Sequence, residues 1–298
     1  MKKLLTTFLT FSVLFICALN ISVAADYFNG FETGTSPGWD AFGASFEPTQ
    51  VSSGTNGIVS ATGSYHAEAG SNAATNFGGY SSVFPSNGYK TSIDIYLDMD
   101  AGLTNDSRFD NISAVSKSDG SHLRDFVFNL GFYNDNTGPG AGTNRFVVSA
   151  SNNATRSSSY PKNPGKSPIA IGTTGWYTFE HVFYDAGGGV LACDLKIFNS
   201  SGTLINSWTL SDPTDIIGSN VGGNRYGWII NEINPLAIDN SLREETTAGP
   251  TEVWVDDDYF DGGTNDGHTW GYDAFDNIPD GIDAVADGGI VHVHDGDY

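Results

Sequence analysis

Two runs of alternating hydrophobic and polar residues, joined by a glycine-rich turn, form the clearest pattern in the chain, at positions 175–198. A period of two indicates β-strands that turn one face toward a core. In the first run, the residues that share one face are Tyr177, Phe179 and Phe183. In the second run, they are Leu191, Cys193, Leu195 and Ile197. The pattern predicts a β-hairpin whose aromatic face is covered by a second sheet.

The same alternation recurs along the chain as far as residue 243. It is most regular at 89–99, where Ile93, Ile95 and Leu97 alternate with polar residues. Other runs that predict strands lie at 46–51, 80–84, 108–116, 124–133, 145–150, 204–210, 224–233 and 236–243. The chain has 298 residues, 37 of them glycine, with 13% aromatic residues. Short strands and many turns in this proportion favour an all-β sandwich.

The chain carries a formal net charge of −22, which bears on its partners. Such a field repels phosphate backbones and anionic lipid headgroups, so nucleic acids and membrane surfaces are poor partners and divalent cations are better ones. The main local exception is the polar stretch 151–167, which carries Arg156, Lys162 and Lys166. We expect this stretch to be a solvated loop.

The first 24 residues predict a secretory signal peptide. Lys2 and Lys3 form its charged start, an apolar run follows to Leu19, and the small residues at 22–24 suit a cleavage site. The sequence therefore predicts a secreted or cell-surface protein. Cys193 is then the only cysteine of the mature chain, so no intrachain disulfide can form, and we expect a buried and unreactive thiol.

The residues after 245 differ in character from the rest. Residues 246–252 contain Gly and Pro and predict a linker. From Glu252 to Tyr298 there are thirteen acidic residues and no Lys or Arg, and the run at 253–259 resembles the run at 291–298. Phe275, Ile278, Ile282 and Val285 stand at helical spacing and predict one helix.

Two groups in this C-terminal part suggest metal binding. Acidic residues at 256–266 could form a calcium loop, but their spacing does not match the helix-loop-helix calcium pattern, which favours a solvated acidic junction. His292 and His294 lie on one side of a predicted strand and could bind a transition metal. No third ligand stands beside them in the sequence, which favours two exposed histidines instead.

Residues 26–245 resemble the concanavalin A-like jelly rolls, which include laminin-G-like and carbohydrate-binding domains of secreted bacterial proteins. The motifs that carry this resemblance are FNGFE at 28–32, GW at 38–39, GWY at 175–177 and LAIDN at 236–240. The resemblance implies an antiparallel jelly-roll sandwich in which the first and last strands are neighbours. It also implies a structural calcium ion held by Glu32 and Asp239. The alternative is that Glu32 caps a turn and Asp239 anchors the last strand.

Residues 253–298 resemble the entrance of a right-handed parallel β-helix. A Val-x-Val-Asp strand, a loop, a capping helix and a Gly-Gly-x-Val-x-Val run follow one another in this segment. The resemblance implies a large secreted β-helix protein, truncated here, whose further rungs follow residue 298. In β-helix polysaccharide lyases the catalytic residues come from such later rungs.

The function that the sequence favours is the non-catalytic binding of an extracellular polysaccharide or surface glycan. The aromatic residues that could form sugar platforms are Trp176, Trp208, Tyr226 and Trp228, unless they belong to the core. No Glu-x-Asp pair typical of jelly-roll glucanases occurs, so we assign no catalytic residue. The alternatives are the N-terminal part of a polysaccharide lyase or hydrolase, and a structural spacer or cap of a surface adhesin.

Overall fold

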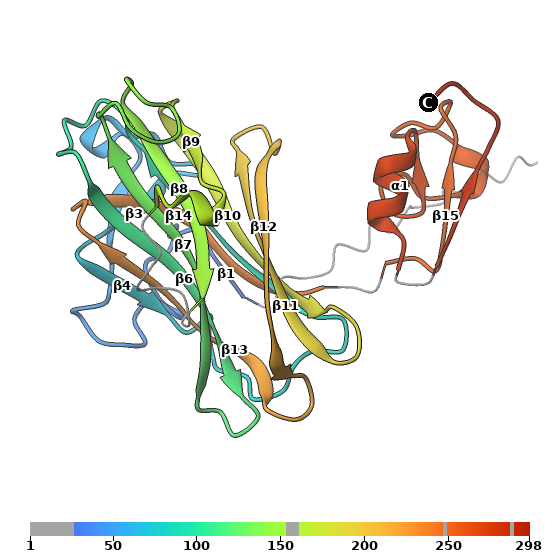
Figure 1. Ribbon diagram of the computed structural model, residues 1–298, viewed down its shortest axis with the longest axis horizontal. Coiled ribbons are helices and arrows are strands. Elements are labelled where there is room, and N and C mark those ends of the chain that lie inside the picture. The colour runs from blue at the N-terminus through green and yellow to red at the C-terminus, as the bar shows by residue number, and fades with distance from the viewer. Residues whose placement is uncertain (1–26, 153–160, 247–248, 287–288) are drawn as a thin grey trace, which may run out of the picture.

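The computed structural model describes residues 27–152, 161–246, 249–286 and 289–298. The predicted signal peptide at 1–24, Arg156 and part of the predicted linker lie outside the described residues. Most of the described chain forms two antiparallel β-sheets, and a smaller C-terminal unit follows them (Figure 1). Among the described residues, no helix has the length and hydrophobicity needed to cross a membrane.

The larger sheet has eight strands in the order β12-β11-β10-β5-β14-β3-β2, with β1 paired to β14. The strands are β1 (Tyr27–Asn29), β2 (Thr49–Ser52), β3 (Tyr65–Ala69), β5 (Tyr89–Leu97), β10 (Gly175–Asp185), β11 (Val190–Asn199), β12 (Leu204–Ile216) and β14 (Leu236–Glu245). Its centre is the predicted hairpin, in which Phe179 pairs with Ile197 and with Ile93 of β5. The first and last strands are neighbours as expected, with Phe28 opposite Leu242.

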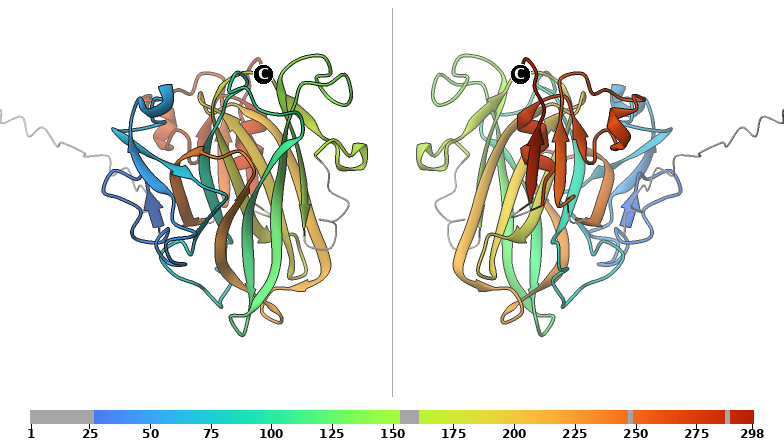
Figure 2. Two further views of the ribbon diagram at one scale, coloured as in Figure 1. Left: turned by 90° about the vertical axis from the view of Figure 1, so that its left-hand side faces the viewer. Right: turned by 90° about the vertical axis from the view of Figure 1, so that its right-hand side faces the viewer.

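The smaller sheet has six strands in the order β4-β13-β6-β7-β8-β9. They are β4 (Asn72–Thr75), β6 (Ser107–Lys117), β7 (His122–Tyr133), β8 (Arg145–Asn152), β9 (Ile169–Ile171) and β13 (Val221–Asn231). The two sheets lie face to face, as the end views show (Figure 2). Short 3₁₀ turns η1 (Thr55–Gly57) and η3 (Pro164–Lys166) lie in the connections.

The core lies between the two sheets and is largely aromatic. Phe128 of β7 meets Phe179 of β10 with ring centroids 5.1 Å apart, and Phe126 meets Phe183 at 5.4 Å, both edge to face. Such pairs contribute about 0.5–1.5 kcal/mol each beyond the burial of their area. Cys193 is fully buried, and burial raises the pKa of its thiol well above the usual value. The hairpin faces and the buried thiol predicted from the sequence are therefore confirmed.

The strand prediction at 80–84 is wrong. This segment is irregular, and the hydroxyl of Ser81 bonds to the carbonyl and amide of Val83, which offers the backbone a local alternative to a ladder. Strand β12 continues beyond its predicted end, because Asp212 and Asp215 pair with Arg124 on β7. The short strands β3, β4 and β9 were not predicted, since β3 and β4 contain mostly alanine and polar residues and β9 has only three residues.

The C-terminal unit contains three short parallel strands in the order β16-β15-β17 and one helix. They are β15 (Glu252–Val255), β16 (Ala274–Phe275), β17 (Ile290–Val293) and α1 (Ile278–Ala284). The sequence echo is confirmed in register, since Val253 pairs with Val291 and Val255 with Val293. The predicted helix is present but shorter, because Asn277 caps its start through the Asp280 amide. These three strands form one small parallel sheet, and a single sheet of this kind does not establish a β-helix.

Candidate functional site

The candidate site lies on the outer face of the six-stranded sheet. Strand pairing places Tyr226 level with Ala114 and Asp125, and Ile230 level with Asp110 and Asn129. Side chains two residues apart share a face, so this face also presents Trp228, Arg108 and Tyr133. The face is not uniformly open, since Ile112 and Val127 at its centre are 1% and 0% exposed. Its accessible parts are two polar clefts and a set of aromatic rings.

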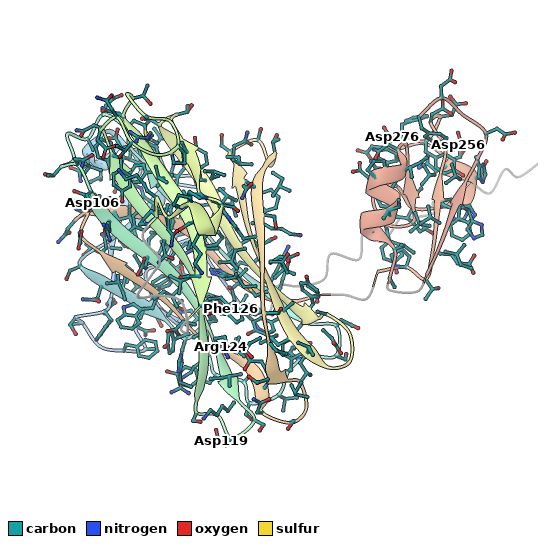
Figure 3. The ribbon with its side chains drawn as sticks, viewed as in Figure 1. Asp106, Asp119, Arg124, Phe126, Asp256 and Asp276 are labelled. Atoms are coloured by element: carbon teal, nitrogen blue, oxygen red, sulfur yellow. The ribbon has the colours of Figure 1, made fainter. Side chains whose placement is uncertain are left out.

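The first cleft has a volume of about 440 Å³. Its lining residues are Asn105, Asp106, Arg108, Tyr133, Asp135, Lys162 and Asn163. The Arg108 guanidinium holds Asp106 by two hydrogen bonds of 2.8 Å, at the edge of the molecule where Figure 3 labels Asp106. The Lys162 ammonium lies 4.1 Å from the centre of the Tyr133 ring and 2.6 Å from an Asp135 oxygen. Cations and carboxylates are therefore interleaved around one buried tyrosine.

A fully buried arginine supports the wall of this cleft. The Arg145 guanidinium donates to the carbonyls of Thr137 and Thr143 at 2.7 and 2.9 Å, and to the Asp135 carboxylate at 3.1 Å. It also donates to the Pro139 carbonyl. Five donors in a planar fork let one side chain fix the whole loop at 135–143. The position of Asp135, and through it that of Lys162, follows from this buried residue.

The charges in the cleft shift the pKa values of its acids in opposite directions. Burial, together with the Asp106 carboxylate that hydrogen-bonds to its hydroxyl, raises the pKa of Tyr133 well above the usual value. The Arg108 guanidinium lowers the pKa of Asp106, and the Lys162 ammonium holds that of Asp135 well below its usual range. At neutral pH the phenol is protonated and both carboxylates are ionised, so the cleft offers hydrogen-bond donors and acceptors side by side.

The second cleft adjoins the first at Arg108 and has a volume of about 240 Å³. Its other lining residues are Phe109, Asp110, Asn129, Pro161, Ile230 and Glu232. The Asn129 amide donates to Asp110 at 2.8 Å and its oxygen accepts from Ser151 at 2.7 Å, which fixes the amide orientation. Because both clefts contain Arg108, they form one polar track across β6 and β7.

The aromatic rings gather around β13 on the same face and form what we call the aromatic ladder. Its members are Phe42, Phe46, Tyr80, Tyr226 and Trp228. Neighbouring ring centroids are 6.3–6.5 Å apart. Tyr80 is 52% exposed, and the Arg225 guanidinium carbon lies 5.4 Å from its ring centre. Accessible rings of this kind can stack against the apolar faces of sugars.

The structure separates the four predicted sugar platforms. Tyr226 and Trp228 are neighbours in the aromatic ladder, on the face that carries the clefts. Trp176 belongs to the eight-stranded sheet and donates from its indole nitrogen to the Val59 carbonyl at 2.8 Å. Trp208 packs against Phe128 of the core with ring centroids 6.2 Å apart. Only two of the four could therefore contact one ligand together.

The predicted calcium ligands lie at the junction of the first and last strands. An oxygen of Glu32 accepts from the amides of Ser64 and Tyr65 at 2.9 and 3.0 Å, and Asp239 accepts from the Thr62 amide at 3.3 Å. The segment at 62–65 thus reaches both carboxylates. Asp239 is fully buried, and desolvation raises its pKa to about 6.

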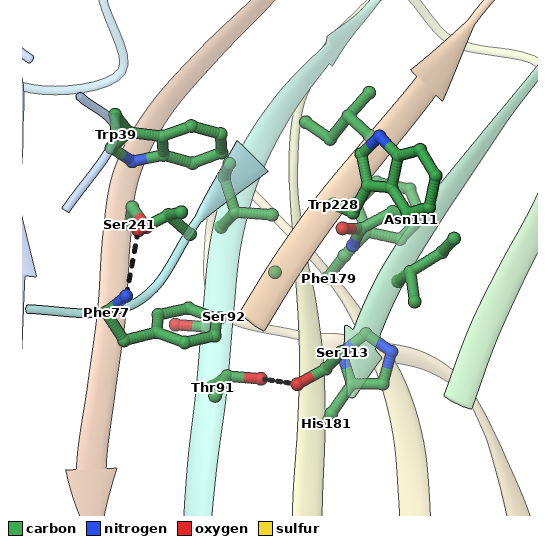
Figure 4. Close-up of a pocket in the computed structure, with 15 residues that line it drawn as sticks. Trp39, Phe77, Thr91, Ser92, Asn111, Ser113, Phe179, His181, Trp228 and Ser241 are labelled. Carbon is green, nitrogen blue, oxygen red and sulfur yellow. Dashed lines mark hydrogen bonds between the residues drawn. The ribbon is translucent and has the colours of Figure 1, made fainter. Parts of the chain in front are cut away.

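A small cavity lies between the sheets, behind the part of β13 that carries Trp228 (Figure 4). Its volume is about 20 Å³, which is room for one water molecule. Five of its lining residues have a buried polar atom without a described hydrogen-bond partner: Trp39, Asn111, His181, Trp228 and Ser241. The Thr91 hydroxyl donates to Ser113 beside it at 2.9 Å. This cavity is too small for a sugar and does not belong to the candidate site.

The residues of the clefts were not singled out in the sequence, apart from Lys162 as a charge on a loop. Arg108, Tyr133 and Lys162 come from three segments that only the sheet order brings together. The one available signal was charge: Arg108 and Arg145 each open a predicted strand, in a chain with 13 basic residues in all.

No protein-family model matches the sequence, and no curated protein matches it. Among solved structures, an endo-β-1,4-glucuronan lyase from the fungus Trichoderma reesei is 10% identical over 76% of this chain and 97% of its own, with a TM-score of 0.41. An alginate lyase mutant in complex with alginate trisaccharide is 10% identical over 62% and 76%, with a TM-score of 0.31. A winged bean acidic lectin complexed with methyl-α-D-galactose is 12% identical over 66% and 87%, with a TM-score of 0.26. These TM-scores are too low to carry a functional argument.

Proposed function

We propose that the two-sheet domain binds an extracellular polysaccharide on the outer face of its six-stranded sheet. The observation that carries this proposal is that one face presents both the aromatic ladder and the two clefts that meet at Arg108. Eight residues of β7 separate the level of Tyr226 from Tyr133, about 27 Å at about 3.4 Å per residue. A ligand that contacts both ends is therefore an extended chain.

The charges of the first cleft suit a ligand rich in hydroxyl groups. Arg108 pairs with Asp106, and Lys162 and Arg145 share Asp135, so three cations face two carboxylates and most of the positive charge is neutralised. Planar guanidinium, carboxylate and amide groups form paired hydrogen bonds with neighbouring hydroxyls. Binding is favoured over hydrolysis, because the lowered pKa values of Asp106 and Asp135 leave neither carboxyl protonated to act as an acid at neutral pH.

A polysaccharide lyase that acts in the same cleft is the second candidate. Tyr133 favours it, because its hydroxyl is protonated at neutral pH while Lys162 and Arg145 lie against its ring, and a phenol of this kind could donate a proton to a leaving oxygen. Incubation with uronate-containing polysaccharides and measurement of unsaturated sugar release separates the two candidates. Release that Tyr133→Phe abolishes supports the lyase, whereas binding without release supports the binding protein.

Affinity electrophoresis of the mature chain against soluble neutral and acidic polysaccharides, with pull-down on insoluble ones, tests the binding proposal. We expect retardation or capture by at least one polysaccharide class. Retention must fall when the polysaccharide is added free as a competitor. A complete absence of retention across the panel would contradict the proposal.

The wider architecture also belongs to this proposal. Strand pairing between β1 and β14 supports a concanavalin A-like jelly roll over 26–245. The in-register parallel pairing of β15 with β17 supports a β-helix entrance after the predicted linker at 246–252, whose last residue, Glu252, is already the first residue of β15. The signal-like residues at 1–24 support secretion. A spacer role in a surface adhesin is the structural alternative, and it predicts no glycan binding.

We further propose a structural calcium ion at Glu32 and Asp239. The support is an uncompensated charge: Asp239 is buried beside Asp94, and neither has an ion pair within the described part of the chain. Carboxylate and carbonyl oxygens are the ligands that Ca²⁺ prefers. We expect calcium to raise the melting temperature of the chelator-treated protein by several degrees, and Glu32→Gln to lose this response. An unchanged melting temperature with and without calcium would exclude the site.

A further inference from the structure

The C-terminal unit brings together three side chains of the types that ligate metals, from three separate segments. Asp256 directly follows β15, His294 directly follows β17, and Asp266 lies in the turn η4 (Asn265–Gly267). One oxygen or nitrogen atom from each lies within 4.8 Å of those of the other two. Figure 3 labels Asp256 among the side chains of this unit. The donor set is one imidazole nitrogen and two carboxylates, so it is not merely an acidic patch.

The parallel register explains why two of these ligands meet. Val255 pairs with Val293, and the His294 amide donates to the Val255 carbonyl at 2.9 Å. Asp256 and His294 are therefore neighbours, each directly after the last residue of its strand, β15 or β17. The sequence alone shows His294 without a further ligand, because residues 38 positions apart become neighbours only through this pairing.

The spacing of these two side chains suits a tetrahedral ion. His294 Nδ1 lies 3.2 Å from an Asp256 oxygen. Two ligand atoms 3.2 Å apart, each 2.0–2.1 Å from a metal, subtend roughly 100° at it, near the tetrahedral angle of structural and catalytic zinc sites. The Asp266 side chain is exposed and can rotate toward the pair.

Neighbouring residues hold Asp256 and the turn that carries Asp266 in place, while a single long hydrogen bond leaves the exposed Asp266 carboxylate room to turn toward the pair. The Tyr259 hydroxyl donates to Asp266 at 3.3 Å, and the Asp258 amide donates to Asp256 at 3.0 Å. The buried side chain of Asn265 accepts from the Phe260 amide at 3.1 Å and so fixes the turn that carries Asp266. Outer contacts of this kind orient the ligands of metal sites.

The charge of this unit favours a cation. Residues 252–298 contain thirteen acidic residues and no Lys or Arg, so histidines are the only cationic partners in this part of the sequence. Ca²⁺ and Mg²⁺ take oxygen ligands, whereas a mixed nitrogen and oxygen set suits zinc and its first-row neighbours. We propose that Asp256, Asp266 and His294 bind one Zn²⁺ ion, with a fourth position open to water or another ligand.

Isothermal titration of the tag-free full chain, stripped with chelator and reloaded with calcium, tests this site with Zn²⁺ as the titrant. We expect one zinc ion per chain. His294→Ala should weaken this binding roughly tenfold or more, since even the loss of an outer contact costs 10–100-fold in affinity. His292→Ala is the matched control, because His292 of β17 pairs with Glu252 of β15 and with none of the three ligands. This variant should leave the affinity within about twofold.

A spectroscopic measurement on the unmodified chain keeps the test independent of the variants. Co²⁺ in place of zinc should give the visible absorption of a tetrahedral site, and Zn²⁺ should displace it. Absence of zinc binding, absence of this absorption, or equal losses in His292→Ala and His294→Ala would each overturn the proposal. Glycan binding by the two-sheet domain does not depend on any of these outcomes.

Discussion

His181 is an ionisable residue enclosed by the aromatic core. Its ring lies 4.8 Å from that of Phe128 and stacks on Phe183 at 6.2 Å, while Nε2 faces no described partner. Desolvation lowers the pKa of His181 to about 3. The unfolded chain, with a histidine pKa of about 6.5, therefore binds a proton between pH 6.5 and 3 that the folded chain does not bind.

This difference predicts an acid-sensitive fold. Because the unfolded state binds the extra proton, stability falls as the pH decreases below about 6.5, by about 2 kcal/mol from His181 between pH 7 and pH 5. His181→Phe, whose larger ring can extend into the adjoining cavity, should lose this part of the pH dependence. Urea unfolding of both proteins between pH 4 and pH 7 measures it, and identical slopes would contradict the account.

Cys193 gives a second prediction for a single residue. The thiol is fully buried with a raised pKa, so a thiol reagent cannot reach it in the folded protein. We expect modification at the rate of global unfolding, fast in denaturant and negligible in native buffer. Rapid labelling of the native chain would show that the centre of the hairpin opens locally.

At the scale of elements, β12 and β7 are connected across the sandwich by a partly buried ion pair. Arg124 of β7 bonds to Asp215, which is nearly fully buried, and to Asp212 at 2.9 Å. Removing one partner of a buried pair leaves an uncompensated charge. The pair therefore holds the C-terminal half of β12 in place.

Arg124→Met should reduce the free energy of unfolding by about 3 kcal/mol, the lower part of the range for such losses. The measurement is equilibrium urea unfolding of the full chain. Arg108→Met is the control, since Arg108 pairs with the exposed Asp106 and exposed ion pairs contribute little to stability. If both variants lose the same stability, the cross-sheet pair has no special role.

Strands were predictable from the sequence where hydrophobic and polar residues alternate, because only one face of such a strand is buried in the core. The hairpin at 175–198 and strand β5 satisfy this condition, and their buried faces agree residue by residue. Strands β4 and β9 do not show this alternation. Strand β9 has only three residues, and β4 contains small residues without a large hydrophobic side chain. The echo at 253 and 291 was readable because parallel neighbours repeat the same alternation.

The site was less predictable because it depends on sheet order. Tyr226 and Trp228 were identified by residue type alone, but the same criterion also selected Trp176 and Trp208, which lie elsewhere. Arg108, Tyr133 and Lys162 meet through the order β6-β7-β8 and the loop that follows β8. A single sequence contains no direct record of which strands are neighbours.

At the scale of the whole molecule, one polysaccharide chain should contact both the aromatic ladder and the two clefts. Tyr80→Ala should weaken binding of a long polysaccharide several-fold, because it removes the most exposed ring of the ladder. It should leave the binding of short oligosaccharides that occupy only the clefts unchanged. Tyr65→Ala, an exposed tyrosine of β3 on the other sheet, is the matched control. Equal effects of Tyr80→Ala on long and short chains would exclude one continuous site.

The most direct test of the central claim is a calorimetric titration of the retained polysaccharide, or its oligosaccharides, into the native chain, Lys162→Met and Lys196→Met. Lys162 lines the first cleft, whereas Lys196 lies on the eight-stranded sheet. We predict that Lys162→Met weakens binding about tenfold, since a hydrogen bond to a charged group contributes about 1.5–3 kcal/mol, and that Lys196→Met changes nothing. Equal affinities of all three proteins would show that the glycan binds elsewhere or not at all.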